Sequence, residues 1–212
     1  MALSRQEFDD GVRVWPAGWG QDFHNRFYAQ LTNENPGGEF TPEWWETFLP
    51  NLTRWKATRG ASSEAITRAV HAGLPELRDA WVEACAPHLH KDISQVTWAE
   101  VAPFANLVAR FKPSRAGGHV RSPVFRSKFC HFLAPAIFPV ADGALMGLFG
   151  QVYEKHFTNV QREWSETSED LRSELRSQLT HHIGAEPTPG YPFVNKIVEL
   201  SLAGRRAQRL TR

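Results

Sequence analysis

Apolar side chains recur along much of this chain at intervals of three or four residues. The clearest example is Leu171, Leu175, Leu179 and Ile183, which lie four residues apart and are followed directly by Gly184. Positions at this spacing fall on one side of an α-helix, and a glycine after the last one is a common helix C-terminus. No stretch shows the convincing alternation of apolar and polar residues that marks a half-buried β-strand. The pattern therefore predicts an all-α protein of about eight to ten helices.

Capping residues indicate where several of these helices begin. Thr41, Pro42 and Glu43 combine a side-chain cap, a proline at the first helical position and an acid in the first turn. Ser4, followed three residues later by Glu7, has the form of a capping box. Further helices are expected from Ser63, Pro75 and Thr97, over Val124–Leu133, and from Phe193 to just before Gly204.

The length of 212 residues suits one domain, or two lobes that pack closely. We expect a single domain over 1–212, with lobes at about 1–95 and 96–204 and a basic tail at 205–212. The tail, Arg-Arg-Ala-Gln-Arg-Leu-Thr-Arg, is expected either to contact a polyanion or to lack fixed structure.

Charge is divided unevenly along the chain. Residues 1–100 carry nine Lys/Arg and fourteen Asp/Glu, whereas 101–212 carry fifteen and nine, so the formal charges are −5 and +6. The stretch 101–141 contains no acid, and its basic residues are Arg110, Lys112, Arg115, Arg121, Arg126 and Lys128. Basic side chains often do no more than solvate a surface, but the length of this stretch favours a phosphate-bearing partner.

Other features narrow the class of protein. Cys85 and Cys130 are the only cysteines, so no disulfide framework is indicated. The N-terminus lacks an apolar core of signal-peptide length, and no run reaches the roughly 18 apolar residues of a membrane span. We therefore expect a cytoplasmic protein with no membrane partner and no obligate protein partner. Cys85, His88 and His90 are potential metal ligands, but no second cluster completes a four-ligand site, so no metal is predicted.

The acid-free stretch ends at a single carboxylate, Asp142. We expect it at the N-terminus of a helix with Leu145, Leu148 and Phe149 inward, where backbone amides and the helix dipole keep a carboxylate ionised. Fourteen residues earlier, Lys128 lies on an apolar helix. Its pKa is expected to be lowered by burial and by neighbouring basic residues, which would make its amine nucleophilic.

The segment from Pro123 to Asp142 resembles the core of the helix-hairpin-helix DNA glycosylases, most closely the 8-oxoguanine glycosylase branch. Those enzymes carry a Pro-Gly-x-Gly-x-Lys hairpin that leads into a helix, then a Pro-Val-Asp or Ala-Val-Asp. Here Lys128 follows Pro123 by five residues, but Val124 and Arg126 occupy the positions of the hairpin glycines, and the lysine-to-aspartate spacing is somewhat shorter than in most of the family. The run Ser-Lys-Phe-x-His-Phe-Leu-x-Pro-x-x-Phe-Pro-Val-x-Asp is also similar to a bacterial group of this fold associated with defence against phages that carry modified bases.

These resemblances imply a compact, two-lobed glycosylase-like bundle that removes a modified base from double-stranded DNA and leaves an abasic site, without a cofactor. Asp142 is expected to stabilise the positive charge that develops on the sugar. Lys128 is either the nucleophile, which would add lyase activity at the abasic site, or a group that anchors phosphate. Phe132, one turn after Lys128, is the counterpart of a residue that lines the base pocket. DNA-backbone contacts are expected from Lys112, Arg115, His119, Arg121 and Arg126.

Two substrate classes stay open, an oxidised purine such as oxidised guanine and a hypermodified phage base such as glucosylated hydroxymethylcytosine. The departures from the hairpin motif favour the second, because they indicate a branch distinct from housekeeping repair. The alternative function is a non-catalytic all-α DNA-binding protein or regulator. A pure binder would have no need for a lone carboxylate beside a basic, apolar helix.

Overall fold

The computed structural model describes residues 1–14, 26, 28–30, 37–112, 123–142 and 152–211. Within these ranges nine α-helices have described bounds, residues 26 and 28–30 are also helical, and there are three short 3-10 helices and no strand, so the all-α prediction is confirmed. The α-helices are α1 (Arg5–Val14), α3 (Pro42–Arg54), α4 (Ser63–Ala72), α5 (Leu74–Ala84), α6 (Trp98–Val108), α7 (Pro123–Leu133), α9 (Tyr153–Glu166), α10 (Glu169–Ile183) and α11 (Phe193–Leu210). The 3-10 helices are η2 (Ala86–His88), η3 (Ile93–Gln95) and η4 (Ala109–Phe111).

Several helix ends lie where the capping residues predicted them. The Thr41 side chain accepts a hydrogen bond from the backbone N–H of Trp44 at 3.2 Å and begins α3. Thr97 and Glu100 form a reciprocal capping box at the start of α6. Gly184 ends α10 in the left-handed conformation, with φ of 72°, which glycine adopts at little cost. These local signals therefore set the limits of the helices that carry the core.

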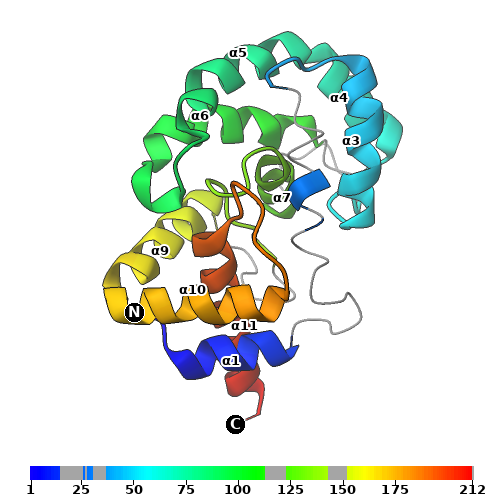
Figure 1. The fold of residues 1–212 in the computed structure, drawn as a ribbon. Helices are drawn as coiled ribbons and strands as arrows, with labels where there is room; N and C mark the ends of the chain where they lie inside the picture. The colour runs from blue at the N-terminus through cyan, green and yellow to red at the C-terminus, as the bar shows by residue number, and fades with distance from the viewer. Residues whose placement is uncertain (15–25, 27, 31–36, 113–122, 143–151, 212) are drawn as a thin grey trace.

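Figure 1 shows two groups of helices with α7 between them. Helices α3 to α6 lie on one side, and α1, α9, α10 and α11 lie on the other. The chain order does not follow this division at its start, because α1 packs against α11 and α10. The first helix therefore belongs with the C-terminal helices, and not with the rest of the expected lobe 1–95. None of the helices that the structure describes has both the length and the apolar character of a membrane span.

Two glycines allow α1 and α11 to approach closely. A side-chain carbon at Gly11 would overlap the carbonyl group of Leu200, and one at Gly204 would overlap the carbonyl group of Glu7. Gly204 does not end the last helix, and the residues on both sides of it stay helical. Its missing side chain instead permits the close contact with α1. The expectation of a helix that stops before Gly204 and a tail from 205 is wrong, since α11 continues to Leu210.

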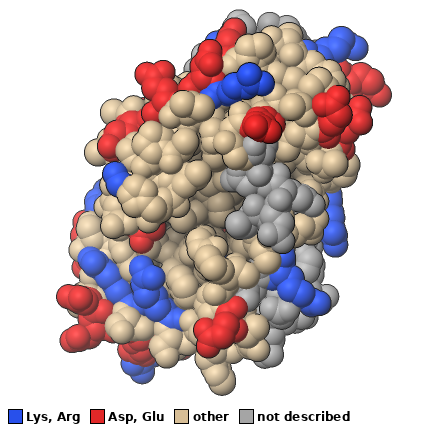
Figure 2. Space-filling view, turned by 45° about the horizontal axis from the view of Figure 1, so that its top comes forward, with Lys and Arg blue, Asp and Glu red and all other residues tan. Residues whose placement is uncertain are grey.

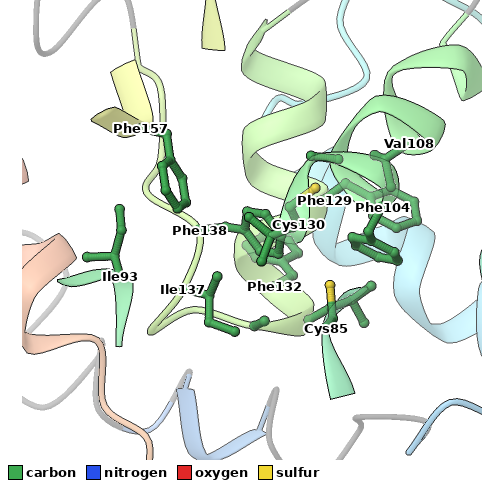
Figure 3. Close-up of a cluster of buried hydrophobic side chains, with 14 of the residues drawn as sticks. Cys85, Ile93, Phe104, Val108, Phe129, Cys130, Phe132, Ile137, Phe138 and Phe157 are labelled. Carbon is green, nitrogen blue, oxygen red and sulfur yellow. The ribbon is translucent and has the colours of Figure 1, made fainter. Parts of the chain in front are cut away.

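Helix α7 runs through the middle of the hydrophobic core. Every residue from Phe125 through Leu133 is buried. Figure 3 shows Phe129, Cys130 and Phe132 of this helix within the same cluster as Phe104 and Phe138. A charged residue on this helix is therefore placed in the protein interior, where its surroundings control its chemistry.

Candidate active site

The structure brings Lys128 and Asp142 together. Lys128 Nζ lies 3.6 Å from Asp142 Oδ2, and the two side chains are 8 % and 31 % exposed. Lys128 comes from the buried helix α7, whereas Asp142 lies in the segment without regular secondary structure that follows it. Solvent therefore reaches part of the Asp142 side chain, whereas the Lys128 side chain is almost fully buried. The helix expected after Asp142, with Leu145, Leu148 and Phe149, lies outside the described residues, as does any cap that Asp142 forms there.

The surroundings of Lys128 lower the pKa of its amine. Burial lowers the pKa of Lys128, and this effect outweighs the opposing influence of the Asp142 and Glu199 carboxylates. The Nζ atom donates a hydrogen bond to the backbone carbonyl oxygen of Trp55 at 2.7 Å. It also lies 5.8 Å from the centre of the Trp55 ring, within the range of a cation–π contact. The amine is therefore held by fixed groups and can exchange its proton more readily than an exposed lysine.

Trp55 is a member of the site that the sequence pattern did not indicate. It follows the last residue of α3, and its N–H donates to the Asn51 carbonyl oxygen at 3.1 Å. The next residue, Lys56, has a φ of 59°, so the chain turns sharply there. The half-buried indole meets the Phe132 ring edge to face, with ring centres 5.0 Å apart. Trp55 and Lys128 are 73 residues apart, so no local signal links them.

Phe132 is buried more deeply than an aromatic side chain whose ring contacts a ligand. It is 1 % exposed, and its ring meets Phe48 as well as Trp55. In this conformation Phe132 supports the Trp55 ring from behind. The assignment of Phe132 to a base pocket stays a prediction, and Trp55 is the aromatic residue of the pair with solvent-accessible surface.

Two of the expected DNA-binding residues make contacts within the protein. Lys112 Nζ donates to the carbonyl oxygens of Arg59 at 2.7 Å and Ala57 at 3.2 Å, and burial lowers its pKa. Lys112 thus braces the turn after α3, close in sequence to Trp55.

Arg126 is 7 % exposed, donates to Asn106 Oδ1 at 3.1 Å and lies over the Tyr153 ring at 4.9 Å. As placed here, Arg126 ties α7 to α6 and α9 and does not reach outward to a phosphate. Arg115, His119 and Arg121 lie outside the described residues.

The potential metal ligands near Cys85 do not converge. Cys85 points into the core, where burial raises the pKa of its thiol, as also happens to Cys130 (Figure 3). His88 Nδ1 lies 3.2 Å from Lys91 Nζ on the other side of the turn. Among the residues that the structure describes, no three His, Cys, Asp or Glu side chains are grouped to hold a metal ion.

Charged side chains of both signs are visible on the face in Figure 2, and groups of each sign occur in both its upper and its lower part. The described residues of this face therefore present no continuous basic surface. The basic loop 113–122, which carries the expected phosphate contacts, is not among them.

Comparison of the chain with protein-family models, with curated proteins and with solved structures gave no match. The functional argument therefore depends on the site geometry and on the resemblance of the segment 123–142.

Proposed function

We propose that this protein is a DNA glycosylase that cleaves the N-glycosidic bond of a modified base and leaves an abasic site. The observation that carries the proposal is the pair formed by Lys128 and Asp142, with 3.6 Å between Nζ and Oδ2. A carboxylate beside an amine of lowered pKa supplies the two groups that this chemistry uses. The same two residues carry the resemblance to the glycosylase segment.

Asp142 stabilises the charge that develops as the base departs. When the bond between C1′ and the base breaks, the electron pair leaves with the base and positive charge spreads over C1′ and O4′. A carboxylate held nearby in a partly dry site lowers the energy of that state, and fixed charges of this kind often supply the largest catalytic effect. Asp142 is 31 % exposed, which is compatible with contact between its carboxylate and a sugar.

Lys128 has two possible roles, between which the buried amine favours the nucleophile. In its neutral form Nζ attacks C1′ as the glycosidic bond breaks and the electron pair leaves with the base. A proton then passes from Nζ to O4′ as the C1′–O4′ bond opens, which gives an imine. Loss of a C2′ proton with departure of the 3′ phosphate from this imine would nick the strand. If Lys128 stays protonated, it positions a phosphate or the base, and water attacks C1′ instead.

Trp55 is the group best placed to hold the extruded base. An enzyme that acts on a base in a duplex must take it out of the stack and bind it against flat apolar groups. The Trp55 indole is partly exposed, and its ring centre lies 5.8 Å from the Lys128 amine. Of the two substrate classes, a hypermodified phage base is favoured over an oxidised purine because of the altered hairpin.

The test is a screen for abasic sites in phage DNAs that differ in their base modifications, with unmodified DNA and an oxoguanine duplex as references. Reactions with borohydride present would trap the imine as a covalent protein–DNA adduct, which Lys128→Ala should not form. Abasic sites in modified DNA without an adduct would make Lys128 a positioning group. Binding to DNA without base release from any substrate would favour the non-catalytic DNA-binding protein.

A further inference from the structure

Four buried polar side chains bind successive main-chain groups of the segment 138–141, which leads to Asp142. They are Ser127, His131, Tyr153 and His156. We propose that they are positioning residues, which fix the main chain of 138–141 so that the Asp142 carboxylate is held against Lys128. The catalytic consequence of this positioning depends on the glycosylase activity proposed above.

The first two contacts hold the start of the segment. His131 Nδ1 is 2.7 Å from the carbonyl oxygen of Phe138, and the Tyr153 hydroxyl donates to the carbonyl oxygen of Pro139 at 2.9 Å. His131 comes from α7 and Tyr153 from α9, so side chains of two different helices hold the segment. Both side chains are at most 1 % exposed. Water therefore does not compete for these carbonyl groups.

The next two contacts hold the residues directly before Asp142. His156 Nε2 is 3.0 Å from the carbonyl oxygen of Val140, and the backbone N–H of Ala141 donates to Ser127 Oγ at 3.0 Å. Ser127 also donates to the Val124 carbonyl oxygen at 3.2 Å, which fixes its rotamer. Every residue from 138 to 141 thus has one main-chain polar group bound by a buried side chain.

Both histidines fill this role in their neutral form. Burial lowers the pKa of His131 to about 3 and that of His156 to about 4. A carbonyl oxygen accepts, so Nδ1 of His131 carries the proton, and Nε2 accepts the Tyr28 hydroxyl at 2.8 Å. The nearby ammonium groups of Lys196 and Lys128 also disfavour a charged His131.

The arrangement links the carboxylate to the helix that carries the amine. Ser127 directly precedes Lys128, and His131 follows it by three residues, so both hold the Asp142 segment from α7 itself. The segment has no helical hydrogen bonds of its own between Phe138 and Asp142. Without these side chains its buried carbonyl groups would lack partners, and the segment would shift to find them. Such a shift would move Asp142 relative to Lys128.

The main test uses Tyr153→Phe and Ser127→Ala, which remove one hydroxyl each with little change in volume. The matched control is Thr167→Val, because the Thr167 hydroxyl is equally buried and bonds main-chain groups of Leu3 and Glu163 far from the site. The two test variants should slow base release at saturating DNA about tenfold to a hundredfold, since small misplacements of a reacting group have effects of this size. Thr167→Val should lose stability without losing rate.

A second readout does not require catalysis. The Lys128 Cε resonance, identified by its absence in Lys128→Arg, would be titrated by NMR in the free protein. Asp142→Asn should lower the pKa of Lys128, because the Asp142 charge raises it. Tyr153→Phe and Ser127→Ala should shift it in the same direction by a smaller amount, and Thr167→Val should leave it unchanged.

His156 allows a rescue experiment. Gln places an amide nitrogen close to the position of the imidazole Nε2, so His156→Gln should keep the hydrogen bond to Val140, whereas His156→Leu removes it. The rate should therefore fall in the Leu variant and largely recover in the Gln variant. Wild-type titration and rate in Tyr153→Phe, Ser127→Ala and His156→Leu would overturn the positioning role. Absence of base release from wild type on every DNA would instead overturn the proposed function, and the NMR titrations would still decide the positioning.

Discussion

The charged cluster around Arg205 and the pair of Lys128 and Asp142 show two different uses of a partly buried ion pair. Arg205 Nε lies 2.7 Å from a Glu7 oxygen, and Arg205 Nη2 lies 2.9 Å from a Glu163 oxygen. Although burial alone would lower the pKa of Arg205, the hydrogen bonds that Arg205 donates to Glu7 and Glu163 outweigh it and raise the pKa. At Lys128 burial outweighs the carboxylate, and the pKa falls.

The difference lies in distance and enclosure. The guanidinium has two carboxylates in direct contact, and all three side chains are at most 13 % exposed. The Lys128 amine lies farther from Asp142, which is 31 % exposed, and donates its shortest hydrogen bond to a neutral carbonyl oxygen. The first cluster is a structural tie between α1, α9 and α11. The second combines an amine of lowered pKa with a partly exposed carboxylate.

The largest effect on rate is expected at the pair of Lys128 and Asp142. Asp142→Asn should lower the single-turnover rate of base release by about 10²-fold or more, because the fixed charge opposite the sugar is removed. The melting temperature should change little, since Asp142 is partly exposed. Rate and melting temperature would be measured on the same preparation. A rate equal to wild type would contradict the role of Asp142.

The buried histidines predict a strong pH dependence of stability. Folding lowers the pKa of His131 to about 3 and of His156 to about 4, so the unfolded chain binds protons first as the pH falls. Stability should be complete above about pH 6.5 and fall below it, by up to about 1.4 kcal/mol per pH unit for each histidine. Urea unfolding at pH 7.5, 6 and 5 would measure this slope. The variant His156→Gln should reduce this slope by the equivalent of up to about one bound proton. An unchanged slope would contradict the burial of a neutral His156.

Removal of Arg205 should affect stability alone. Arg205→Met leaves Glu7 and Glu163 without their shared partner, and breaking a buried ion pair in this way typically costs about 3–5 kcal/mol. The free energy of unfolding at pH 7.5 would be compared with the NMR titration of Lys128. A variant that is destabilised but titrates Lys128 as wild type would support the separation of the two clusters. A large shift in the Lys128 titration would contradict it.

The smallest effect is expected at the aromatic wall of the site. Trp55→Leu should lower kcat/KM for modified DNA by about tenfold, since stacking of a base on an aromatic ring is worth about 1–3 kcal/mol. Trp55→Phe, which keeps a flat face, should lose less. Trp164→Phe is the matched control, because that ring lies under Arg172 and Arg176, which belong to α10. Equal kcat/KM values in all of these variants would contradict a role of Trp55 in binding the base.

Much of the fold could be predicted from local patterns. The caps at Thr41 and Thr97 and the glycine at Gly184 place helix ends correctly, because a cap satisfies groups within one turn of itself. Lys128 and Asp142 were singled out by a resemblance that spans only their own segment. The structure places Lys128 Nζ 3.6 Å from Asp142 Oδ2, and the catalytic meaning of the pair stays a prediction.

The sequence by itself determined the helical class, most helix starts and which two residues could form a reactive pair. Only the tertiary structure decided that Trp55 contacts Lys128, that Arg126 turns inward and that α11 continues past Gly204. The physical reason is the distance along the chain over which each kind of interaction acts. Capping and periodicity act within a few residues, whereas the contacts of a buried lysine or of a helix glycine depend on chain segments that meet only when the core closes.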